Sequence, residues 1–200
     1  MHGRSTVKDV SSQQAVSNSM ERVATAVKNV RNIYGDKNTI VIDNGDTIQG
    51  TLVAQYAITH KADKENPMIT AMKAIGYDVW GMGNHEFNYT PEQRDTQTLL
   101  ADKAGIAVLS ANLTLLKDGK NFRGEDANAG DSYYDPYIIK TLDAGNGRTV
   151  RVAIIGFGNA ANATWDLATN YPNLQFSSLD NPNGDLENEV NKWTKEIKDK

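Results

Sequence analysis

Apolar residues recur every three or four positions along several stretches of the chain, which is the spacing of amphipathic helices. Three such stretches lie in the first half, and each ends at or beside a glycine, a residue that commonly terminates helices. The helices are expected over residues 11–34, 67–76 and 90–105. Pro67 and Pro91 stand where the second and third helices should begin, as is common at the first helical position.

Short apolar runs lie between these helices and predict buried strands at residues 39–42, 77–82 and 106–110. Helix and strand therefore alternate three times in the first 110 residues. This order is typical of a layered α/β sheet, so the fold class is predicted to be α/β.

The second half of the chain has a different pattern. Residues 117–135 are polar and aperiodic, which predicts a long surface loop, whereas residues 137–142 and 149–157 flank a glycine-rich turn and predict a β-hairpin. Helical spacing returns over residues 186–197. The chain stops soon afterwards at Lys200 without a cap or a following strand, so we expect a C-terminally truncated domain.

Composition narrows the possible functions. Two hundred residues suit one domain or most of one, and the absence of cysteine excludes disulfide scaffolds, thiolate metal sites and cysteine nucleophiles. A net charge of −4 argues against a nucleic-acid polymer as partner. The longest aliphatic run, residues 152–155, is far too short to span a membrane, and no signal-peptide core follows Met1, so no membrane partner is expected.

Polar clusters follow two of the predicted strands. Residues 43–46 read Asp-Asn-Gly-Asp, and residues 83–86 read Gly-Asn-His-Glu. Because the carboxyl ends of parallel strands meet at one edge of a sheet, Asp46, Asn84 and His85 should converge there, with the glycine in each cluster allowing a sharp turn. Their oxygen and nitrogen donors suit a divalent cation. Either cluster alone would be explained by an ordinary turn, but their joint occurrence favours a site.

Several motifs resemble the signatures of the calcineurin-like metallophosphoesterases, in particular their 5′-nucleotidase branch. The matching segments are Met-His-Gly at residues 1–3, Gly-Asp-Thr-Ile-Gln-Gly at 45–50 and Gly-Asn-His-Glu-Phe at 83–87. Segments similar to the 2′,3′-cyclic-nucleotide 2′-phosphodiesterase/3′-nucleotidases are Asn-Tyr at 88–89, Ile-Gly-Phe at 155–157 and Trp-Asp at 165–166. The resemblance implies a metallophosphoesterase layered sandwich of mixed β-sheets flanked by helices. Residues 1–200 would form the N-terminal part of its catalytic domain, without the C-terminal nucleotide-binding domain.

The resemblance also implies a role for individual residues. His2 would bind the first of two divalent metal ions, Asp46 would bridge both, and Asn84 would bind the second. His85 would act on the phosphoryl group, either by stabilising charge on its oxygen or by protonating the leaving oxygen. This ligand set accepts manganese, iron, cobalt or zinc, and it leaves the substrate-binding residues unassigned.

Three further residues are candidates for supporting this site. Asn88 stands where 5′-nucleotidases more often have aspartate, and an amide orients His85 less strongly than a carboxylate does. Asn112 follows the end of a predicted strand, as the site clusters do. Asp43 either supports Asp46 or belongs only to the turn that ends its strand, and we favour the turn.

The chain departs from the family pattern in its metal ligands. The aspartate of the first signature would precede Met1, and the later histidine motifs are absent because the only histidines are His2, His60 and His85. Two protein ligands per ion make a weak site, since catalytic metals usually have three. We therefore expect the parent protein to be an enzyme and this chain to be impaired.

The implied reaction is hydrolysis of 2′,3′-cyclic nucleotides to 3′-nucleotides, and of 3′-nucleotides to nucleosides and phosphate. The partner would be a small nucleotide, and the parent protein would be exported to the periplasm or cell wall. The alternatives are a 5′-nucleotidase or UDP-sugar hydrolase, or a folded, non-catalytic fragment that binds metal weakly.

Residues 156–161 also match a dinucleotide-binding fingerprint, but the preceding strand belongs to the predicted hairpin, so we expect a loop at the rim of the phosphoesterase site.

Overall fold

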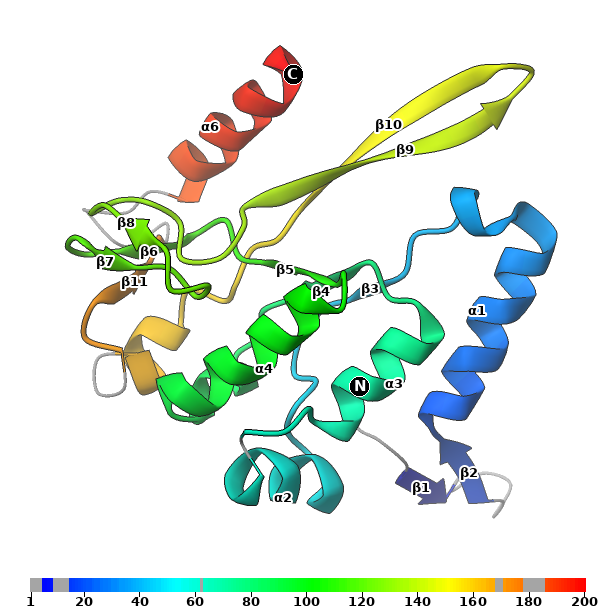
Figure 1. The fold of residues 1–200 in the computed structure, drawn as a ribbon, viewed down its shortest axis with the longest axis horizontal. Helices are drawn as coiled ribbons and strands as arrows, with labels where there is room; N and C mark the ends of the chain where they lie inside the picture. Colours follow the sequence, from blue (N-terminus) through cyan, green and yellow to red (C-terminus); the bar gives the residue numbers. More distant parts are fainter. Residues whose placement is uncertain (1–4, 9–14, 62, 168–170, 178–185) are drawn as a thin grey trace.

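The computed structural model describes residues 5–8, 15–61, 63–167, 171–177 and 186–200. Its centre is a parallel sheet in which the middle strand, β4, pairs with β3 on one side and β5 on the other. These strands are β3 (Ile42–Asp43), β4 (Val79–Gly81) and β5 (Ala107–Leu109). The helices of the first half are α1 (Met20–Tyr34), α2 (Leu52–His60), α3 (Pro67–Ile75) and α4 (Pro91–Lys103), and Figure 1 shows them beside and below this sheet. The alternation of helix and strand confirms the predicted α/β class.

Local capping chemistry explains where α3 and α4 begin and end. Asn66 caps α3 by accepting a hydrogen bond from the Met68 amide, and Gly76 ends the helix in the left-handed conformation. Thr90 and Gln93 form a reciprocal capping box at the start of α4. Both helices lie where the sequence predicts them.

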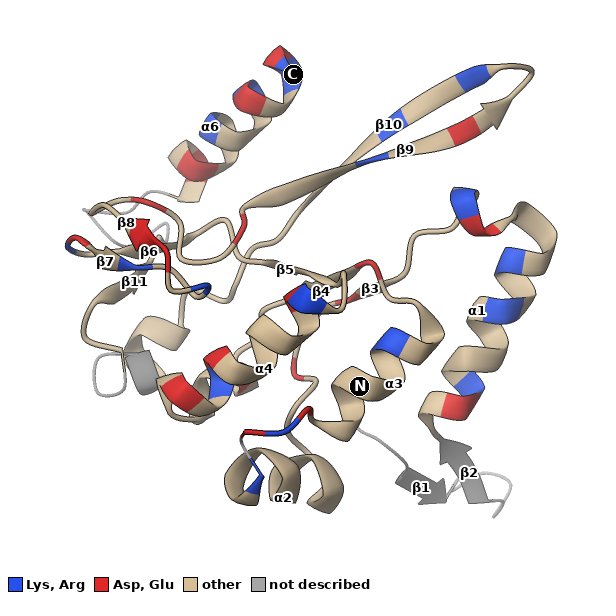
Figure 2. Cartoon of the chain, in the orientation of Figure 1, with Lys and Arg blue, Asp and Glu red and all other residues tan. Residues whose placement is uncertain are grey.

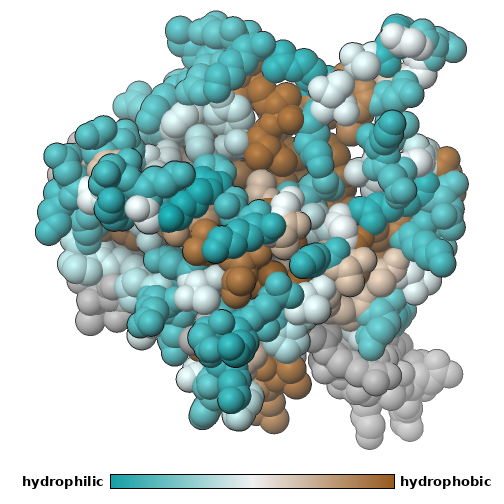
Figure 3. Space-filling model, viewed as in Figure 1, coloured by the Kyte–Doolittle hydropathy of each residue, from teal (hydrophilic) through white to brown (hydrophobic). Residues whose placement is uncertain are grey.

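The helices of the first half differ from the prediction in two ways. The first helix begins at Met20 rather than at residue 11, because β2 (Ala15–Asn18) pairs antiparallel with β1 (Ser5–Lys8). Helix α2 was not predicted at all. Its apolar residues surround the helix instead of following one face: Ala54 and Ile58 are buried, while Leu52 is 87% exposed. Figure 2 shows α2 largely without charge, and Figure 3 shows apolar surface over it.

The second half contains the predicted hairpin and final helix. Strands β9 (Tyr137–Gly145) and β10 (Arg148–Ile155) pair antiparallel and extend away from the central sheet (Figure 1). Trp193 is the buried residue of α6 (Leu186–Asp199). Two strand pairs were not predicted. They are β6 (Leu113–Leu115) with β11 (Leu174–Phe176), and β7 (Gly119–Lys120) with β8 (Asp126–Ala127). The second pair lies inside the predicted surface loop, so that loop is partly ordered as a small hairpin. Short helical turns complete the chain: η1 (Asp36–Asn38), η2 (His85–Asn88) and the π-helical turn η3 (Ala163–Leu167).

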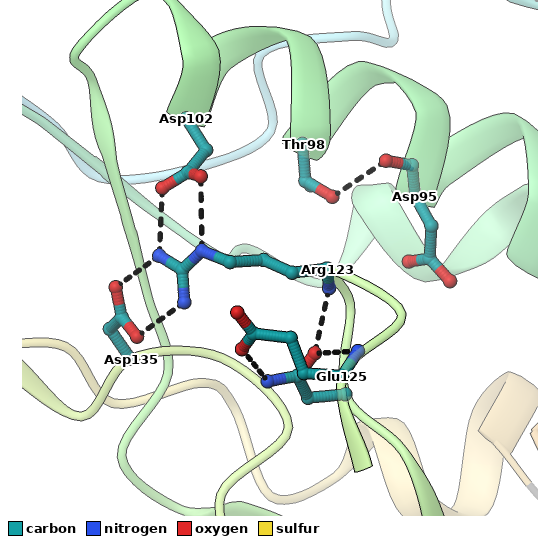
Figure 4. A network of polar contacts seen from close by, with 7 residues as sticks. Asp95, Thr98, Asp102, Arg123, Glu125 and Asp135 are labelled. Atoms are coloured by element: carbon teal, nitrogen blue, oxygen red, sulfur yellow. Dashed lines mark hydrogen bonds and ion pairs between the residues drawn. The ribbon is translucent and has the colours of Figure 1, made fainter.

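Two arginines tie the second half to α4. Arg94 is fully buried, forms an ion pair with Asp95 at 2.7 Å, and lies 4.2 Å from the centre of the Tyr171 ring. Arg123 lies between Asp102 of α4 and Asp135 and donates hydrogen bonds to both carboxylates (Figure 4). These contacts fix residues 117–135 against the helix that follows the candidate site.

Candidate active site

The first polar cluster forms a tight turn at the end of β3. Asp43 is 4% exposed, and its carboxylate accepts hydrogen bonds from the Gly45 amide at 3.0 Å and from the Thr47 hydroxyl. Gly45 and Asp46 both have positive φ, at 97° and 61°. Asp43 therefore holds the turn that carries Asp46, whose left-handed backbone is uncommon for a residue other than glycine.

The second cluster follows β4 and lies directly against this turn. A Cβ atom on Gly45 would lie 2.3 Å from the Gly83 nitrogen, and one on Gly83 would lie 2.4 Å from Asp46 Oδ1. The loops can approach this closely only because both residues are glycine. The His85 amide donates a hydrogen bond to Asp46 Oδ1 at 3.1 Å, so the structure brings Asp46 together with the segment that carries Asn84 and His85.

Glu86 belongs to the second polar cluster but was given no role from the sequence, yet it joins the two loops. Its buried carboxylate accepts hydrogen bonds from the amides of Gly83 at 2.9 Å, Asp46 at 2.9 Å and Thr47 at 2.6 Å. Burial raises the pKa of Glu86, and the hydrogen bonds from Asp46 and Thr47 oppose this effect. The signal that could have indicated this role is the position of an acid directly before Phe87, a core residue.

His85 is held from two directions. Phe87, fully buried two residues later, packs edge-to-face against Phe176 with 5.2 Å between ring centres and so anchors η2 in the core. On the outer side, His85 Nδ1 and Asn88 Oδ1 are 2.7 Å apart. With the Asn88 oxygen as the acceptor, Nδ1 is the donor of this hydrogen bond, and Nε2 is the nitrogen left for a further partner.

Known proteins resemble this chain in sequence and in fold. No family model matches the chain. The trifunctional nucleotide phosphoesterase protein YfkN of Bacillus subtilis (strain 168) is 35% identical over 139 residues, 64% of this chain and 8% of that protein. The 2′,3′-cyclic-nucleotide 2′-phosphodiesterase/3′-nucleotidase of Haemophilus influenzae is 33% identical over 141 residues, 66% of this chain and 19% of that protein.

The structural match extends over nearly the whole chain. The crystal structure of calcineurin-like phosphoesterase YfkN from Bacillus subtilis has a TM-score of 0.70 and 27% sequence identity, and the match covers 98% of this chain and 55% of that one. In sequence and in fold the chain resembles the calcineurin-like phosphoesterases. This confirms both the predicted family and the predicted metallophosphoesterase fold. The chain spans only 8% and 19% of the length of the two curated relatives above.

Asn112 contacts the segment that follows β10. Its fully buried amide accepts a hydrogen bond from the Gly158 nitrogen at 2.8 Å and donates to the Gly158 and Ser177 carbonyls at 3.0 and 3.3 Å. Both amide protons and the oxygen are thus engaged by backbone. Asn112 holds the segment after β10 in position.

That segment contains the dinucleotide-binding match. Residues 156–161 lead into the short π-helical turn η3 rather than into the α-helix that such a fingerprint requires. Turn η3 lies beside η2, the turn that carries His85, and Trp165 on η3 is 56% exposed. The segment therefore borders the candidate site, and π-helical turns are frequent at functional sites.

Calcineurin-like phosphoesterases use divalent metal ions, and this chain supplies some of the donors that such ions need. Asp46 and Asn84 offer carboxylate and amide oxygens, which suit a divalent cation. His2 lies outside the described residues. Within the described ranges, no three histidine, aspartate or glutamate side chains stand together as a ligand group. The described donors fit part of a metal site and do not complete one.

None of the helices in the described part of the chain has both the length and the apolar composition needed to cross a bilayer.

Proposed function

We propose that the protein containing this chain hydrolyses 2′,3′-cyclic nucleotides to 3′-nucleotides, and 3′-nucleotides to nucleosides and phosphate. The observation that carries the proposal is the junction of two loops at which Asp46 meets the segment bearing Asn84 and His85. A Haemophilus influenzae relative named for these two reactions supports the choice of substrate. In this proposal residues 1–200 are the N-terminal part of the catalytic domain, and the nucleotide-binding domain lies outside them.

Two divalent metal ions belong to this proposal, with His2 as a ligand of the first, Asp46 of both and Asn84 of the second. When bound, such ions polarise the phosphoryl oxygens and lower the pKa of water. Manganese, iron, cobalt and zinc all suit these donors.

The protein's own contribution to the reaction is a positioned proton donor. Asn88 fixes the Nδ1 side of His85, and in the imidazolium form of His85 the Nε2 atom carries the proton that the leaving group needs. In a 2′,3′-cyclic phosphate, the oxygen of water bonds to phosphorus, the bond from phosphorus to the 2′ oxygen breaks, and that oxygen takes the Nε2 proton. The water gives up one proton to solvent, and His85 regains its proton from solvent. The product is a 3′-monoester; in a second attack by water the bond from phosphorus to the 3′ oxygen breaks in the same way, which releases phosphate and the nucleoside.

The family resemblance also favours export of the parent protein to the periplasm or cell wall. Fractionation of cells producing the parent protein tests this part: hydrolase activity in the extracytoplasmic fraction is expected, and activity confined to the cytoplasm would contradict it.

The test of the reaction is manganese-dependent hydrolysis of 2′,3′-cyclic AMP by this chain, beside 5′-AMP and UDP-glucose as substrates of the alternative enzymes. His85→Ala should reduce turnover about 100-fold or more, the usual contribution of general acid catalysis. His60→Ala is the matched control, because His60 lies at the exposed end of α2. Preference for 5′-AMP would favour a 5′-nucleotidase. No turnover by a folded chain that binds Mn²⁺ would favour the non-catalytic alternative.

A further inference from the structure

Glu86 has no exposed surface and lies between the two loops of the candidate site. Oε2 accepts hydrogen bonds from the Asp46 and Gly83 amides, and Oε1 accepts one from Thr47. We propose that Glu86 is a positioning residue that fixes the Asp46 turn against the Gly83 loop and thereby sets where the Asp46 carboxylate stands. This inference rests on the proposed function of the site.

The hydrogen bonds form a closed circuit around the site. Glu86 Oε2 holds the Asp46 amide at 2.9 Å, Asp46 Oδ1 accepts from the His85 amide at 3.1 Å, and His85 is the residue before Glu86 in the chain. One oxygen of Asp46 is therefore fixed by the backbone of the opposite loop. A change in the position of Glu86 would move Asp46 and His85 together.

Glu86 and the three amides that donate to it, those of Asp46, Thr47 and Gly83, together form the Glu86 clamp. The backbone of Asp46 explains why this clamp is needed. With a φ of 61°, Asp46 has a conformation that residues other than glycine rarely adopt, so the turn requires partners that hold it. Glu86 provides them for two consecutive amides, those of Asp46 and Thr47, and Asp43 holds the same turn from the other side through Gly45. Groups that orient metal ligands in this way typically change metal affinity 10- to 100-fold when they are replaced.

Substitution with glutamine tests the clamp at nearly constant shape. Glu86→Gln keeps one acceptor oxygen and places an NH₂ group against amide donors, so at least one of the three hydrogen bonds must be lost. Glu86→Asp keeps the carboxylate but is one methylene shorter, and it serves if the glutamine variant does not fold. Gln97→Met is the matched control: Gln97 is also fully buried and also bridges backbone groups, the Asn66 amide at 2.8 Å and the Lys64 carbonyl at 2.9 Å.

Two readouts by NMR separate positioning from general stability. The first is hydrogen exchange at the Asp46, Thr47 and Gly83 amides, which should be at least about tenfold faster in Glu86→Gln at sites that lose their acceptor. The second is broadening of the resonances of these loops by added Mn²⁺, which should require at least about tenfold more metal in the variant. Gln97→Met should lower the melting temperature while leaving both readouts as in the wild type.

Unchanged exchange and unchanged Mn²⁺ response in folded Glu86→Gln would overturn the proposal, as would the same losses in Gln97→Met. A wild-type chain that shows neither Mn²⁺ response nor turnover would count against the proposed function alone. The amide exchange would then decide the role of Glu86, because faster exchange confined to the three amides of the clamp supports it and uniform exchange contradicts it.

Discussion

Gly83 lies where the two loops of the site touch, and replacing it with alanine would force them apart. The added Cβ would lie 2.4 Å from Asp46 Oδ1, 2.6 Å from the Asp46 nitrogen and 2.9 Å from Glu86 Oε2. Ordinary contacts begin at 3.4 Å, so the Asp46 turn would have to move by about 1 Å. Such a shift weakens the hydrogen bonds by which Glu86 joins the loops.

The expected cost follows from these contacts. Overpacking of this kind costs about 1–3 kcal/mol, and a weakened hydrogen bond adds about 1 kcal/mol. The free energy of unfolding should therefore fall by about 2–4 kcal/mol. For a domain of this size the melting temperature should fall by about 4–16 °C.

Gly81→Ala is the matched control for this experiment. The nearest atom to a Cβ at Gly81 would be the Asp43 carbonyl oxygen at 3.5 Å, an ordinary contact, and the residue precedes Gly83 by only two positions. Its free energy of unfolding should stay within about 1 kcal/mol of the wild type. Thermal and urea unfolding followed by circular dichroism compare the two variants. Equal losses in Gly83→Ala and Gly81→Ala would refute the steric argument.

Three other changes test separate parts of the structure. Burial, with a smaller contribution from Asp43, raises the pKa of Tyr77 to about 12. An unfolded tyrosine ionises near pH 10, so the stabilisation that the neutral Tyr77 hydroxyl gives below pH 10 is lost between pH 10 and pH 12. Over that range, urea unfolding should show the free energy of unfolding falling about 2–3 kcal/mol more in the wild type than in Tyr77→Phe. An equal fall in both proteins would contradict the raised pKa of Tyr77. Arg123→Met leaves the Asp102 and Asp135 carboxylates without their shared partner and should lower the free energy of unfolding by about 1–3 kcal/mol (Figure 4). An unchanged melting temperature would show that the contacts of Arg123 do not stabilise the fold. Asn88→Ala removes the acceptor from His85 and should lower kcat for 2′,3′-cyclic AMP about tenfold with little change in KM; a change in KM alone would assign Asn88 to substrate binding.

The fold was predictable where local chemistry determines it and unpredictable where distant segments do. Helix α4 carries its own start signals in Thr90, Pro91 and Gln93, which form its capping box. Strand β6, by contrast, pairs with β11 about sixty residues later, and no local pattern in either three-residue strand reveals the partner. Helix α2 escaped prediction because its apolar residues are not confined to the buried face.

For the site, the sequence indicated which loops meet but not what joins them. The rule for parallel strands is enough to bring Asp46 toward His85, because it depends only on strand order. The two glycines were expected to serve sharp turns, and this holds for Gly45, with its φ of 97°. Gly83 is absent from the positive-φ residues described, and its need for glycine comes from the loop packed against it.

The close approach of the two loops at Glu86 explains why residue 83 is glycine. A carboxylate can accept amides from two loops only if their backbones come within hydrogen-bond reach of one side chain, and that distance excludes a Cβ at Gly83. Gly83 and Glu86 therefore act together: Gly83 leaves room for the two backbones to approach, and the Glu86 carboxylate accepts hydrogen bonds from their amides. It follows that substitutions at the two positions should not be additive: once Gly83→Ala has separated the loops, Glu86→Gln should cost less than it does alone. A double-mutant cycle on the free energy of unfolding measures this coupling, and strict additivity would mean that the acid and the glycine act independently.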